Sequence, residues 1–133
     1  MQPVERHLEL IAGGYAWVAT ASNQGVVGFV NAERFGTWLH VWEASVRYEC
    51  QGYGIGRRLL DCVVRAARAT DLAGVTLTTF SDVPWNRPFY ERLGFVVLGT
   101  RDSPYWLQRI LEDEAGNGLP GRCAMALILQ GRR

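Results

Sequence analysis

A glycine-rich loop is the first segment of the chain whose residue types and spacing point to chemistry. It carries Gln51, Gly52, Gly54 and Gly56, and it joins an apolar segment that ends at Val46 to a segment with a helical pattern. Free backbone N–H groups at the start of a helix, together with the helix dipole, form a site for anions. Glycines leave room for a phosphate to approach, but they also serve tight turns by their backbone geometry alone. The loop therefore predicts either a phosphate site or a turn of purely structural purpose.

The nucleotide-binding forms of such a loop do not match. The third glycine of the dinucleotide fingerprint would fall at position 59, which is Leu59. The chain also has no lysine, so neither a loop that ends in Gly-Lys-Ser/Thr nor a Schiff-base lysine is possible. These absences argue against a nucleotide-binding domain and against lysine-based covalent catalysis.

Charge and composition narrow the class of protein further. The 133 residues carry 14 basic and 13 acidic side chains, a net charge of +1, which is unlike the strong basic excess of a general nucleic-acid binder. Residues 47–68, however, contain five arginines and only two acidic residues, Glu49 and Asp61, which gives a local charge of +3. This local excess suits a polyanionic ligand, although a solvated helix face explains it equally well.

Other residue types indicate where the protein works and what it lacks. The three cysteines, Cys50, Cys62 and Cys123, are odd in number and widely spaced, which favours a reducing compartment and hence the cytoplasm. With two histidines and no Cys-x-x-Cys pair, we expect no metal site. No apolar run is long enough to span a membrane, and the first residues do not resemble a secretory signal.

Hydrophobic periodicity predicts a single α/β domain over residues 1–133. We expect a mixed, mostly antiparallel sheet flanked by helices, with one parallel pair across the helix that follows the glycine loop. The predicted helices cover residues 3–12, 56–70, 84–93 and 105–114, and the predicted strands cover residues 15–21, 26–33, 38–46, 75–81, 95–98 and 123–129.

Two motifs together resemble those of the GNAT N-acetyltransferases. Gln51, Gly54 and Gly56 match the family's Gln/Arg-x-x-Gly-x-Gly/Ala loop, and residues 86–95 are similar to its second motif, which ends in Tyr-x-x-x-Gly-Phe. The resemblance extends over roughly residues 14–129. It implies that acetyl-CoA is the cosubstrate and that the parallel strands, here 38–46 and 75–81, splay apart. Residues 1–14 leave less chain before the first strand than relatives usually have, so we expect an abbreviated acceptor side.

The resemblance also implies a set of cofactor contacts. Main-chain groups of the loop would hold the diphosphate, and a bulge near residues 43–46 would free backbone groups for the pantetheine arm, with the N–H of Val46 or a neighbour at the thioester oxygen. Asn86 would contact the arm. Tyr53 stands where relatives often have a basic residue, and Arg47, Arg57 and Arg58 would compensate for it. The predicted cofactor-binding residues are Ser45, Val46, Arg47, Gln51, Gly52, Tyr53, Gly54, Ile55, Gly56, Arg57, Asn86 and Tyr90.

For catalysis, Tyr90 matches the family tyrosine that protonates the leaving thiolate, the alternative being a core ring. Glu43 is the predicted base for the acceptor ammonium, the alternative being an exposed strand carboxylate. His40 and Glu33 are weaker candidates for the base, and Trp42 is either core or a wall of the acceptor pocket.

The implied reaction is transfer of an acetyl group to the primary amine of a small molecule by direct attack in a ternary complex. Two alternatives stay open: a catalytically silent acyl-CoA-binding module, and an acceptor amine on a protein or peptide. Many relatives form dimers, and we expect a homodimer through an exposed edge near the last strand.

Overall fold

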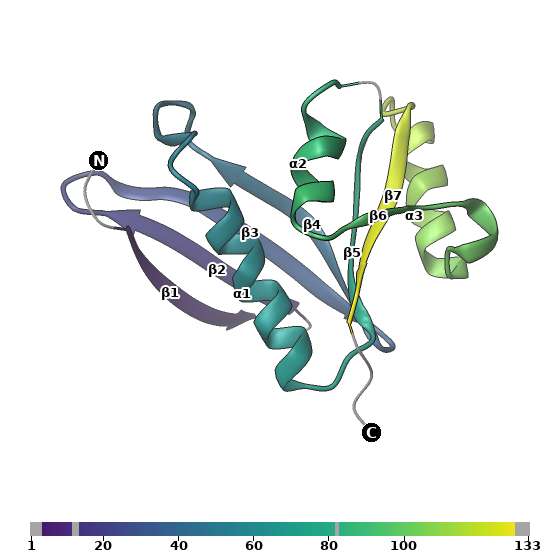
Figure 1. The fold of residues 1–133 in the computed structure, drawn as a ribbon, viewed down its shortest axis with the longest axis horizontal. Coiled ribbons are helices and arrows are strands. Elements are labelled where there is room, and N and C mark those ends of the chain that lie inside the picture. Colours follow the sequence, from purple (N-terminus) through teal and green to yellow (C-terminus); the bar gives the residue numbers. More distant parts are fainter. Residues whose placement is uncertain (1–3, 12–13, 82, 130–133) are drawn as a thin grey trace.

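The computed structural model describes residues 4–11, 14–81 and 83–129, the first strand by its backbone alone. Seven strands form one sheet in the order β1-β2-β3-β4-β5-β7-β6 (Figure 1). The strands are β1 Val4–Ile11, β2 Gly14–Ala21, β3 Gly25–Phe35, β4 Trp38–Val46, β5 Gly74–Phe80, β6 Val96–Leu98 and β7 Arg122–Ile128. The α-helices are α1 Ile55–Ala69, α2 Asn86–Arg92 and α3 Tyr105–Gly116, with short 3₁₀ turns at Tyr48–Cys50 and Thr100–Asp102.

The predicted fold class is confirmed: the sheet is mixed, and all its pairings are antiparallel except that of β4 with β5. The helix predicted at residues 3–12 is wrong, because residues 4–11 form strand β1; residues 3 and 12 lie outside the described part. Val4 and Leu8 fit a helical repeat, but together with Leu10 they also fit the two-residue repeat of a strand. Pairing with β2, from Val4 opposite Ala21 to Ile11 opposite Gly14, decides between the two.

Helices cover the two faces of the sheet differently. Helix α1 crosses β2–β5 on one face (Figure 1), where its apolar stripe joins the main core with Leu39, Val75 and Met125. Helix α3 packs on the other face against β7: its Leu107 and Ile110 are buried but lie outside the main core. Alternating residues of β7 therefore serve two separate apolar layers.

Strands β4 and β5 are joined at only three positions, from Trp38 opposite Gly74 to His40 opposite Thr76. Beyond that point the two strands diverge (Figure 1), so the predicted splayed pair is present. Because β4 loses its neighbour there, residues 42–45 are exposed although they lie in the middle of the sheet.

A β-bulge in β4 lies beside this opening. Asn31 of β3 faces Glu43 while Ala32 faces Val41, so Trp42 is the extra, unpaired residue. The bulge thus begins one residue before the stretch 43–46 that the resemblance implies. It sends the side chains of two consecutive residues, Trp42 and Glu43, toward the face opposite α1, because the alternation of sides is interrupted there.

One edge of the sheet lies next to the last strand, as expected. The last strand, β7, lies between β5 and β6, and the edge on this side is the three-residue strand β6, with Val96 and Val97 exposed. The opposite edge is β1. Of the described helices, none is both long and apolar enough to traverse a lipid bilayer.

Candidate active site

A groove of about 510 Å³ lies where β4, the glycine loop, the start of α1 and helix α2 meet. This volume is within the usual range for small-molecule sites. Ten of the predicted cofactor residues line it: Ser45, Val46, Gln51, Gly52, Gly54, Ile55, Gly56, Arg57, Asn86 and Tyr90. The sequence motifs, which are about 35 residues apart along the chain, are therefore brought together in one hollow.

The start of α1 forms the anion-binding end of the groove. Gly54 precedes the helix with φ 80°, a left-handed conformation that side-chain-bearing residues rarely adopt, and no side chain caps the helix. The first-turn N–H groups have no partner within the helix, and the first turn contains no acidic residue. Unpaired N–H groups and the positive helix end together favour a phosphate at this position.

Gln51 connects the glycine loop to β4. Its side-chain Nε2 donates a hydrogen bond to the backbone oxygen of Val46 at 3.1 Å. Arg47, the residue directly after β4, donates its backbone N–H to the backbone oxygen of Val27 in β3 at 2.8 Å. Since successive peptide groups of a strand point to opposite sides, the N–H of Val46 points away from β3, into the opening between β4 and β5. A backbone donor is thus available beside the groove, with the loop fixed to it.

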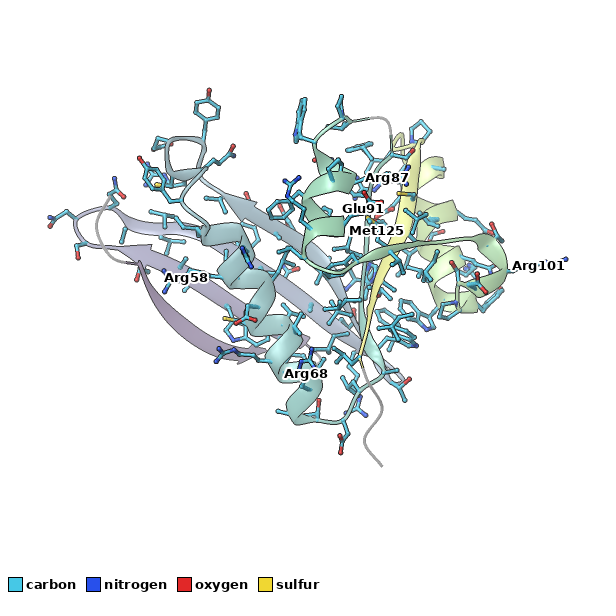
Figure 2. All side chains as sticks on the ribbon, in the orientation of Figure 1. Arg58, Arg68, Arg87, Glu91, Arg101 and Met125 are labelled. Atoms are coloured by element: carbon cyan, nitrogen blue, oxygen red, sulfur yellow. The ribbon has the colours of Figure 1, made fainter. Side chains whose placement is uncertain are left out.

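Arginines surround the phosphate end. Arg57 and Arg92 line the groove, and both also line an adjoining hollow of about 420 Å³ along α1. Arg58 and Arg68 of α1 (Figure 2) also line that second hollow. The local positive charge predicted for residues 47–68 therefore lies next to the groove, and Arg92 of α2, which the sequence reasoning did not include, adds to it.

Tyr90 forms part of the wall on α2. Its ring contacts Phe89 and Phe95 edge-on, with centroids 5.1 and 5.9 Å away. Burial raises the pKa of its phenol, partly offset by the positive charge of Arg122. The hydroxyl is consequently protonated at neutral pH and able to donate.

An ion pair between Arg87 and Glu91, with 3.6 Å between Nη2 and Oε2, spans one turn of the same helix (Figure 2).

Three predicted site residues lie outside the groove lining. Arg47 donates to Glu49 at 2.7 Å and to the backbone oxygen of Gln24 at 3.2 Å. The side chain of Tyr53 is exposed. Glu43 is exposed on the other face of the sheet, beside the opening.

Some lining residues were missed by the sequence reasoning. They are Ala44, Cys50, Leu60, Trp85, Phe89 and Arg92. Trp85 directly precedes the second motif and Phe89 lies within it, so their place beside Asn86 and Tyr90 was the available signal. Leu60 follows from the helical repeat of α1, since it lies one turn after Gly56.

The face opposite α1 holds a second group of side chains. The indole Nε1 of Trp42 donates to Glu33 at 2.9 Å. Behind it, His40 is buried, with its Nδ1 2.8 Å from the hydroxyl of Thr76, and burial lowers the pKa of His40 to about 4. His40 is therefore uncharged at neutral pH and a poor proton acceptor. In the described part of the chain, no three His, Cys, Asp or Glu side chains gather as metal ligands would.

Comparison with known proteins agrees with this geometry. The sequence model of the acetyltransferase (GNAT) domain matches residues 12–97. An acetyltransferase from Bacillus subtilis solved with CoA superposes with a TM-score of 0.72 at 15% identity, covering 96% of this chain and 100% of that one.

Two further solved structures share the fold. A putative streptothricin acetyltransferase from Bacillus anthracis, solved with acetyl coenzyme A, has a TM-score of 0.70 at 19% identity, covering 92% of this chain and 70% of its own. A GNAT-family acetyltransferase from Staphylococcus aureus has a TM-score of 0.69 at 21% identity, covering 89% and 69%.

Proposed function

The chain belongs to the GNAT acetyltransferases, and we propose that it transfers the acetyl group of acetyl-CoA to the primary amine of a small molecule. The observation that carries this proposal is the groove in which the capless start of α1, the Gln51–Val46 hydrogen bond and Tyr90 converge. A nucleotide alone would need the phosphate end only. The open strand edge of β4 beside it suits an amide-rich arm, which can bond to backbone groups as an added strand would.

The diphosphate of the cosubstrate fits the N–H groups of residues 54–57, with Arg57 and Arg92 as neighbouring positive charges. The pantetheine arm would run along residues 44–46 in the opening between β4 and β5. There the N–H of Val46 would donate to the thioester oxygen as it gains negative charge. The exposed backbone of this stretch and its orientation support the assignment.

Acetyl-CoA supplies an acyl group activated as a thioester. The acceptor approaches from the face that carries Glu43, which takes up a proton from its ammonium group directly or through water. The amine nitrogen then bonds to the acyl carbon, the carbon–sulfur bond breaks, and the nitrogen loses a second proton to solvent as the amide forms. Tyr90 donates its phenolic proton to the departing sulfur, and solvent restores that proton. The protonated phenol in the groove and the carboxylate at the opening supply an acid and a base on opposite faces of the sheet.

The cytoplasm is the proposed location, on the strength of the odd number of widely spaced cysteines. A homodimer is also proposed, formed through the short edge strand β6, where Val96 and Val97 are exposed. Sedimentation of the purified protein tests the dimer, and Val97→Glu should shift it toward the monomer.

Thiol release from acetyl-CoA with a panel of primary amines tests the activity. The panel includes alkyl amines, amino acids and short peptides, so that small and peptide acceptors are compared directly. Acetyl-CoA should also stabilise the fold, by about 2.7 kcal/mol at one hundred times its dissociation constant. Stabilisation without thiol release for any amine would instead identify a catalytically silent acyl-CoA-binding module.

A further inference from the structure

The face of β3 and β4 opposite α1 carries a group of acidic, amide and aromatic side chains next to the opening in the sheet. We call it the far-face cluster; it consists of Asn31, Glu33, Phe35, Trp42, Glu43 and Trp106. Asn31 is the cross-strand partner of Glu43, and Glu33 lies two residues further along β3, so the three side chains share one face. The bulge at Trp42 adds its indole to the same face.

The two carboxylates of the cluster are the hydrogen-bond acceptors that it offers to a ligand. Glu33 accepts from the Trp42 indole with one oxygen, 2.9 Å away, and Glu43 is exposed. The Oδ1 atom of Asn31 is buried and has no hydrogen-bond partner among the described residues. Arg34, between Asn31 and the turn, donates its Nε to the backbone oxygen of Gly36 at 2.8 Å instead of facing the carboxylates. Two carboxylates on one face favour a ligand that is positively charged and donates hydrogen bonds.

Aromatic rings complete this environment. Phe35 stacks on Trp106 of α3 with ring centroids 4.6 Å apart and planes 9° from parallel. Trp42 meets Phe35 edge-on at 6.1 Å and leaves 46% of its surface exposed. The negative face of an exposed indole attracts organic cations, ammonium groups in particular. Two independent features, the acceptor atoms and the rings, therefore favour the same ligand charge.

We infer that the acceptor is a short diamine, a molecule with two ammonium groups at neutral pH. The inference rests on the proposed function and specifies its substrate class. One amine lies at Glu43, beside the opening where acetyl transfer takes place, and the second ammonium lies at the other carboxylate oxygen of Glu33, over the exposed face of the Trp42 ring. Glu33 lies one diagonal step from Glu43 on the paired strands, with the bulge at Trp42 beside them. Diagonal neighbours of a regular ladder are about 7–8 Å apart, a spacing that suits a chain of a few methylenes.

A series of three amines of nearly equal size tests the charge of the distal group. The probes are 1,4-diaminobutane, butylamine and 4-aminobutanoate, which place an ammonium, a methyl and a carboxylate at the far end. We expect kcat/KM to be about tenfold higher for the diamine than for butylamine, from one ion pair and one cation–π contact. We expect a further loss of about tenfold for 4-aminobutanoate, because its carboxylate would face Glu33.

The variant Glu33→Gln tests whether the carboxylate of Glu33 causes the preference for the diamine. Its amide oxygen can still accept the Trp42 hydrogen bond, so the local packing is kept while the charge is removed. The preference for the diamine over butylamine should fall from about tenfold to about twofold. The control Glu112→Gln, which removes the same charge from an exposed position on α3, should keep the full preference.

The outcomes separate the inference from the proposed function. Equal kcat/KM for the three amines, a preference for 4-aminobutanoate, or an unchanged preference in Glu33→Gln would overturn the diamine assignment while leaving acetyl transfer intact. Thiol release with none of the three amines would overturn it as well. In that case the wider amine panel decides on the proposed function, and the stabilisation by acetyl-CoA shows whether the protein is folded and binds its cosubstrate.

Discussion

The Nδ1 atom of His40 lies 2.8 Å from Oγ1 of Thr76, and these two residues are the last Cα pair that joins β4 to β5. Their hydrogen bond therefore sits at the point where the sheet opens. Rings of Phe35, Trp42 and Trp106 meet the imidazole edge-on with centroids 6.2, 4.8 and 5.7 Å away, so the polar pair is enclosed by aromatic surface. A charge on His40 would be poorly solvated there.

This enclosure predicts a loss of stability in mild acid. Burial lowers the pKa of His40 from 6.5 to about 4, so between those values the unfolded chain binds a proton that the folded chain does not. The free energy of unfolding should therefore fall as the pH falls from about 6.5 to about 4. The contribution of His40 to that loss is on the order of 3 kcal/mol. Urea unfolding at several pH values measures it.

Other groups titrate in the same range, so the comparison with His40→Asn is decisive. The variant removes the titrating group and keeps a polar atom near the Thr76 hydroxyl. The difference in unfolding free energy between the two proteins should shrink steadily from neutral pH toward pH 4. Parallel curves for the two proteins would show that His40 is not the group responsible.

Tyr90→Phe tests the proposed acid. The substitution removes only the phenolic oxygen, and the ring can keep its contacts with Phe89 and Phe95. Turnover at saturating acceptor should fall by about a hundredfold, as expected for loss of a general acid. The affinity for acetyl-CoA, measured by calorimetry, should change little. Tyr105→Phe on α3, where the ring is 71% exposed, is the matched control and should leave turnover unchanged.

Much of the fold can be predicted because its signals are local. The strand 38–46 is rich in aromatic and β-branched residues, the helix after the glycine loop has a clear apolar repeat, and the two motifs lie in one groove. The first strand resembles a helix in sequence because its apolar residues fit both repeats, and only the neighbouring strand β2 resolves them. The sequence of β1 alone does not show that this segment pairs with β2.

The site is harder to predict where it depends on how segments that are distant in the sequence pair and pack against one another. Trp42 and Glu43 should point to opposite faces by simple alternation, and the bulge against Asn31 places them on one face. The charge of Arg47 suggests a place at the phosphates, but the nearby carboxylate of Glu49 holds it. Arg92 contributes to the groove from a separate helix, and its place depends on how α2 packs.

Gln51 offers a test of how the loop is held. Gln51→Ala removes the 3.1 Å hydrogen bond to the Val46 oxygen, so the loop and the strand edge are no longer fixed to each other. Affinity for CoA should fall about fivefold, in keeping with the usual net value of such a bond. Gln51→Glu should weaken binding more, because a carboxylate would face both the carbonyl oxygen and the diphosphate. Calorimetric titration with CoA measures both, and equal affinity for all three proteins would remove Gln51 from this role.

Gly74 is the residue at which the parallel pair begins, and its position tolerates no side chain. A Cβ atom there would collide with the backbone oxygen of Leu127 and lie 2.7 Å from a ring carbon of Trp38. Gly74→Ala should therefore lower the free energy of unfolding by about 3 kcal/mol or more, because the backbone of β7 cannot move aside without breaking its pairing with β5. Gly99→Ala is the control, since a Cβ atom at that position would meet nothing within 4 Å, and it should change stability by at most about 0.5 kcal/mol. Equal unfolding midpoints for the two variants in urea would contradict the close approach of β5, β7 and Trp38 at this point.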